Sequence, residues 1–114
     1  MKQSNQIFKN EYLPHNFLAE KMIISSLLVS SEAIELTIKT LPFDAFYFQN
    51  HQEIYRAISF MYQNKIPIDI ITLITFLQDN GLLKQIGGIK VLIELVSQFP
   101  NLVYLEEYLA LVKD

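Results

Sequence analysis

Two histidines and several dispersed carboxylates are the side chains of this sequence with the types needed for metal binding or acid–base chemistry. His15 and His51 are too few and too far apart to form a recognisable metal motif, and only the fold decides whether a carboxylate such as Glu53 approaches either of them. Structural roles suit both, His15 beside Pro14 at a helix start and His51 as a hydrogen-bonded core or boundary residue. We therefore expect no metal ligand.

Acid–base catalysis would require two carboxylates that meet in the folded chain. The candidates are Asp44, Glu53, Asp69 and Asp79. Each has a simpler local role as a cap, a turn residue or a surface residue, so we expect no catalytic residue. A small helical hydrolase remains an alternative interpretation, and a concave site with perturbed acids would be its signature.

The segment IGGIK contains the glycine doublet that could be mistaken for a phosphate-binding loop. It lacks the GxxxxGK[ST] frame and a preceding strand, so we predict that Gly87 and Gly88 form a turn before a helix. Nine basic residues occur singly in a chain of net charge −3, which leaves no visible patch for nucleic acid. The aromatic residues lack interleaved Lys or Arg, which favours core and interface roles over base stacking. We expect no cofactor in this chain.

Length and composition predict one all-helical domain. The chain has 114 residues, of which 51% are hydrophobic, and contains only three glycines and four prolines. The absence of cysteine excludes disulfides and thiolate sites, and favours a reducing compartment. No apolar run is long enough to span a membrane. Residues 1–13 resemble no targeting signal, so we expect a flexible arm there, followed by a head domain over residues 14–100.

Caps and apolar periodicity predict where the first helices lie. The first is expected to begin after Pro14, with Asn16 as its N-cap. A second, over Ser31–Thr40, is expected to be capped by Ser31 and ended by Pro42. The longest is expected between residues 46 and 65. The core face of the first is predicted at Leu18, Met22, Ile23 and Ser26, and that of the longest at Tyr47, His51, Ile54, Ile58 and Met61.

The segment NKIPIDIITLITFLQDNGLL reads as a turn, a capped helix and a glycine stop. Pro67 restricts the residue before it to extended backbone, and Asp69 can accept a backbone N–H in the first turn of the helix. Gly81 stands where a left-handed residue is expected after the helix. Another helix should follow Gly88 and end at Pro100. Its core face is predicted at Ile89, Leu92, Val96 and Phe99.

The last helix, over residues 101–114, carries two apolar stripes rather than one. The first stripe is formed by Leu102, Leu105, Leu109 and Val112, and the second by Tyr104, Tyr108 and Leu111. One stripe is enough to dock a terminal helix on its own domain, so the second is expected to meet another partner. We predict that Tyr104, Tyr108 and Leu111 mediate self-association. The helix has no stop signal before the end of the sequence, which is typical of a helix cut in the middle.

Three stretches together resemble the N-terminal domain of the bacterial-type replicative DNA helicase DnaB. The stretch LPHNFLAEKMIISSLL is similar to the family's Pro-x-Asn-x-x-Ala-Glu opening. The stretch FYFQNHQEIYRAISFMYQNKIPID is similar to its Phe-Tyr, His, Ile-Tyr and Pro-x-Asp string, and TLITFLQDNGLLKQIGGIKVLIEL to its Thr-Leu, Gly and Gly-Gly pattern. The resemblance covers residue 13 to the C-terminus. One departure is Ser25, where the family usually has glycine.

The resemblance implies a compact bundle of about six helices whose last helix is the truncated start of a helical hairpin. It implies a non-catalytic collar that assembles helicase subunits into dimers or a hexameric ring and docks primase and loading factors. The ATP- and Mg-dependent motor would lie C-terminal, since no Walker motif is present here, and the motor would contact most of the DNA. The abundance of Ile, Phe, Asn and Lys suggests an AT-rich genome, hence plastid stroma or bacterial cytoplasm. A free-standing adaptor that binds an amphipathic helix is the alternative function.

Overall fold

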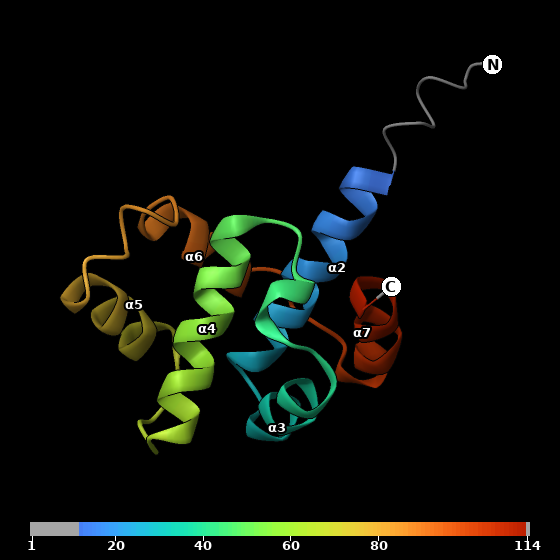
Figure 1. The fold of residues 1–114 in the computed structure, drawn as a ribbon, viewed down its shortest axis with the longest axis horizontal. Helices are drawn as coiled ribbons and strands as arrows, with labels where there is room; N and C mark the ends of the chain where they lie inside the picture. The colour runs from blue at the N-terminus through green and yellow to red at the C-terminus, as the bar shows by residue number, and fades with distance from the viewer. Residues whose placement is uncertain (1–11, 114) are drawn as a thin grey trace.

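A computed structural model of the chain describes residues 12–113, and within this range the fold is built from helices without strands. The all-helical fold predicted from composition is therefore confirmed. The α-helices are α2 (Tyr12–Leu27), α3 (Ser31–Thr40), α4 (Gln49–Gln63), α5 (Ile70–Asp79), α6 (Ile89–Val96) and α7 (Leu105–Lys113), with short 3-10 helices η1 (Phe43–Ala45) and η2 (Leu102–Tyr104) (Figure 1). Within the described range, no helix has the length and apolar character that a bilayer span requires.

Helix α2 is the central element, because α3, α4, α6 and α7 all pack against it (Figure 1). The predicted core face was confirmed for Ile23 and Ser26, which are buried, and was wrong for Leu18, which is 53% exposed, and for Met22, which is half-buried. A helix with neighbours on several sides buries most of its circumference, so no one stripe defines its core. The residues that it buries are Ala19, Glu20, Lys21, Ile23, Ile24, Ser25, Ser26 and Leu27.

The start of α2 also differs from the prediction. The helix begins at Tyr12, so Asn16 lies inside it rather than at its N-cap, and Pro14 stands in the first turn. Proline is tolerated there because first-turn N–H groups have no acceptor within the helix. The expected arm therefore falls mostly on residues 1–11, which lie outside the described residues.

Helices α3 and α4 pack against α2 and against each other. The N-cap of α3 is Ser30 rather than Ser31, and its Oγ accepts the N–H of Ala33 at 3.1 Å. In α4 the predicted core residues His51, Ile54, Ile58 and Met61 are buried, but Tyr47 precedes the helix and is 67% exposed. The hydroxyl of Tyr55, also buried, donates to the carbonyl of Leu41 at 2.8 Å, and burial raises its pKa to about 12.

Helix α5 has the caps that its sequence indicates. The side chain of Asp69 accepts the N–H of Thr72 at 2.8 Å, and the Thr72 hydroxyl accepts the N–H of Asp69 in return. At the other end Gly81 has φ +70°, and the N–H of Leu82 donates to the carbonyl of Leu77 at 2.8 Å. This bond closes a Schellman motif, so the helix stops at a defined residue.

Helix α6 is shorter than predicted and ends at Val96. Two residues assigned to its core face were wrong, since Ile89 is 44% exposed and Phe99 is 85% exposed. Phe99 lies beyond the last helical turn with φ +53°, so it no longer shares a face with the buried Leu92. Before the helix, Gly87 has φ +114°, and a Cβ there would lie 2.6 Å from a methyl carbon of Val91. The turn therefore requires glycine at this position.

Candidate self-association surface

Helix α7 packs against α2 and α3 through one face only. Leu105, Leu109 and Val112 are buried, as predicted, and they occur at the spacing of a single helical stripe. Leu102 was expected in the same stripe but is 45% exposed, because it belongs to η2 and precedes the first turn of α7. Asn101 caps the start of η2, because its Oδ1 accepts the N–H of Val103 at 3.0 Å.

The residues predicted for self-association lie beside the buried face of α7, with Tyr104 at the end of η2 and Tyr108 and Leu111 on the helix itself. Tyr104 is 51% exposed and Leu111 is 41% exposed, whereas Tyr108 is half-buried and packs partly against the core. Tyr108 and Leu111 are spaced i and i+3 and therefore share one side of α7, and Tyr104 precedes them at the end of η2. Burying a side chain of this kind contributes roughly 1.5 to 3 kcal/mol. We call Tyr104, Tyr108 and Leu111 the α7 stripe.

Further exposed apolar side chains occur in the segment between α6 and α7. Phe99 is 85% exposed, Leu102 is 45% exposed and Val103 is 78% exposed. Single exposed apolar residues are normal, but several within one short segment are typical of a contact surface. The sequence analysis missed Phe99 and Leu102 as surface residues because it assigned them to core stripes. Their position outside the helices was the deciding feature, and only the fold showed it.

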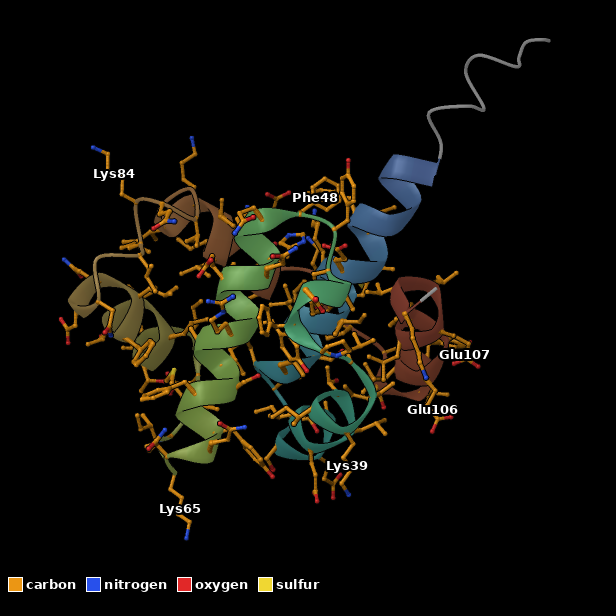
Figure 2. All side chains as sticks on the ribbon, in the orientation of Figure 1. Lys39, Phe48, Lys65, Lys84, Glu106 and Glu107 are labelled. Atoms are coloured by element: carbon orange, nitrogen blue, oxygen red, sulfur yellow. The ribbon has the colours of Figure 1, made fainter. Side chains whose placement is uncertain are left out.

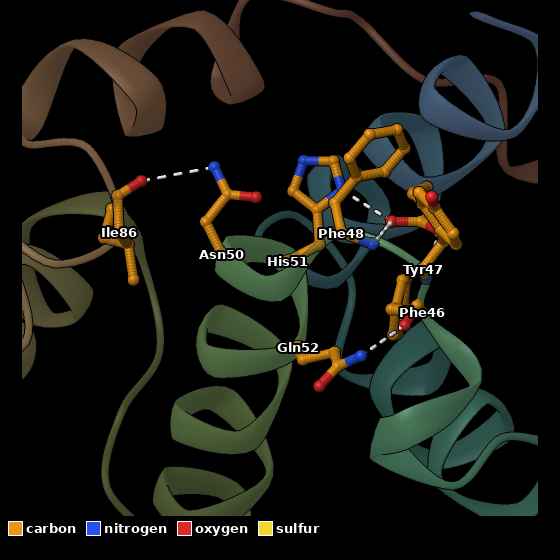
Figure 3. Close-up of polar contacts among 8 residues, drawn as sticks. Phe46, Tyr47, Phe48, Asn50, His51, Gln52 and Ile86 are labelled. Carbon is orange, nitrogen blue, oxygen red and sulfur yellow. Dashed lines mark hydrogen bonds and ion pairs between the residues drawn. The ribbon is translucent and has the colours of Figure 1, made fainter. Parts of the chain in front are cut away.

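The opposite arrangement is found at the start of α4, where polar groups are buried and paired. Glu20 from α2 is 1% exposed, and its carboxylate accepts the N–H of Tyr47 at 2.6 Å and that of Phe48 at 3.4 Å. His51 Nδ1 lies 2.7 Å from Glu20 Oε1 (Figure 3). The N-cap residue Phe48 has no side-chain acceptor of its own. Glu20 therefore binds the backbone just before α4 from a different helix.

Aromatic rings cover this polar cluster. The ring of Phe17 stacks on His51 with centroids 5.4 Å apart, and Phe48 meets the same imidazole edge-on at 5.6 Å. Two side-chain amides of α4 bind backbone carbonyls near the cluster. Gln52 donates to the carbonyl of Phe46, and Asn50 donates to the carbonyl of Ile86 (Figure 3). The expected role of His51 as a hydrogen-bonded core residue agrees with this geometry. The cluster positions α4 on α2, and its two titratable members, Glu20 and His51, are each 1% exposed.

The remaining charged candidates have separate roles. Asp69 caps α5, and Glu53 accepts a hydrogen bond from Gln49 at 3.2 Å. Lys21 is 3.0 Å from Glu94 on α6 and lies over the ring of Phe17. Across residues 12–113, no group of three or more His, Asp or Glu side chains is arranged to hold a metal ion.

Comparisons with known proteins agree with the resemblance seen in the sequence. The family described as "DnaB-like helicase N terminal domain" matches residues 12–114. A "Probable replicative DNA helicase" from Trieres chinensis is 62% identical over 98% of this chain and 25% of its own length. The "Replicative DNA helicase DnaB" from Nostoc sp. is 32% identical over 92% of this chain and 12% of its own length.

A solved structure matches as well. The N-terminal domain of DnaB helicase from Mycobacterium tuberculosis aligns with a TM-score of 0.77 at 33% identity, and the alignment covers 83% of this chain and 66% of that one. The chain spans about a quarter or less of the length of the curated relatives named above. The chain therefore matches, in fold and in sequence pattern, one domain of relatives that are much longer.

Proposed function

The chain belongs to the DnaB-like helicase N-terminal domain family, and we propose that it is the assembly and docking domain of a replicative DNA helicase. In this role it joins helicase subunits into dimers and a hexameric ring. It also offers a surface to primase and to a helicase loader. ATP hydrolysis with Mg²⁺, and most contacts with DNA, belong to a motor domain that follows it in the parent protein. The relatives that match it are named as replicative DNA helicases, which supports this assignment.

The observation that carries the assembly role is the α7 stripe. The helix buries one face on α2 and leaves Leu111 exposed, and Val103 and Tyr104, in η2 just before it, are exposed as well. Apolar surface that its own domain does not cover is stabilised by a second surface, and in an assembly domain that surface belongs to another subunit. A free-standing adaptor would show the same stripe, but family membership favours the helicase.

Variants of the α7 stripe test the assembly role. Tyr104→Glu and Leu111→Glu place a charge on exposed positions, so we expect the unfolding midpoint to stay close to that of the parent chain. We expect self-association to weaken by about tenfold or more, because the charge must be desolvated in the contact. Light scattering after gel filtration, over a range of protein concentrations, measures the change.

Ile93→Glu is the matched control, since Ile93 is 55% exposed on α6 and lies outside the stripe. It introduces the same charge and should leave self-association unchanged. Equal behaviour of Tyr104→Glu and Ile93→Glu would contradict the assembly role of the stripe. Tyr108 is less suitable for this test, because its half-buried ring also packs against the core.

The cellular compartment is part of the same proposal. We infer the plastid stroma or the bacterial cytoplasm, the two places named by the composition of the sequence. The 62% identical relative comes from a diatom, which supports the plastid.

A further inference from the structure

We draw no further inference here: the strongest candidate, the apolar groove between the α2–α3 turn and the α4–α5 connection, where Lys65 projects beyond the end of α4 (Figure 2), carries no proposal because nothing in the described part of the structure shows what covers it.

Discussion

The start of α4 and the exposed side of α7 differ in which side chains they bury and which they expose. At the start of α4, the buried carboxylate of Glu20 is matched by the N–H of Tyr47 and by His51. At the end of η2 and along α7, the ring of Tyr104 and the side chain of Leu111 remain exposed. The first region places polar groups where water is absent, and the second places apolar groups where water is present.

The difference shows which region serves the fold and which serves a partner. A buried polar group is tolerated only when its hydrogen bonds are made, so the contacts of Glu20 fix the position of α4 on α2. An exposed apolar face adds nothing to the stability of its own domain, and it gains free energy only when another surface covers it. Changes at Glu20 should therefore affect folding, and changes at Tyr104 should affect association.

The largest effect is expected from Glu20→Ala. The substitution leaves the N–H of Tyr47, the N–H of Phe48 and His51 without their shared acceptor in a dry site. We expect a loss of about 3 kcal/mol in the free energy of unfolding, measured by urea denaturation. Glu106→Ala, at an exposed position, is the control and should change stability little. A loss at Glu20 no greater than that at Glu106 would remove the distinction between the two regions.

A smaller effect is expected from Tyr55→Phe, which removes a buried hydroxyl that donates to the carbonyl of Leu41. At neutral pH the loss should be about 1 kcal/mol. The pKa of Tyr55 is raised from 10.0 to about 12 in the folded chain, so the folded state keeps its proton while the unfolded state loses it. The contribution of Tyr55 is therefore fully present below pH 10 and declines as the pH rises toward 12.

The pH dependence gives this prediction its own measurement. The difference in unfolding free energy between the parent chain and Tyr55→Phe should be greatest at pH 8 and should shrink between pH 10 and 12. A difference that stays constant over this range would contradict the assigned cause, which is burial of the phenol.

The parts of the fold that depend on local chemistry could be predicted from the sequence. Asp69 and Gly81 bound α5 because a cap and a left-handed glycine act within a few residues of the helix end. The buried stripe of α7 was predicted for the same reason, since Leu105, Leu109 and Val112 fall on one face in any helix of this register.

The parts that depend on distant contacts could not be predicted. Glu20 reads as a surface residue in its own helix, and the N–H groups that it binds come 27 and 28 residues later. The face of α2 was misassigned because neighbours cover it on several sides. The α7 stripe was recognised as surplus apolar surface, but the sequence alone did not reveal that Tyr108 is half-buried against the core.

Sedimentation equilibrium of the 114-residue chain, from micromolar to near-millimolar concentration, tests most directly whether the exposed face of α7 is an assembly surface. We predict a reversible increase of the average mass above that of the 13.3 kDa monomer, and a smaller increase for Tyr104→Glu at the same concentrations. A mass of one monomer at every concentration would contradict the claim that the α7 stripe of this chain joins two copies.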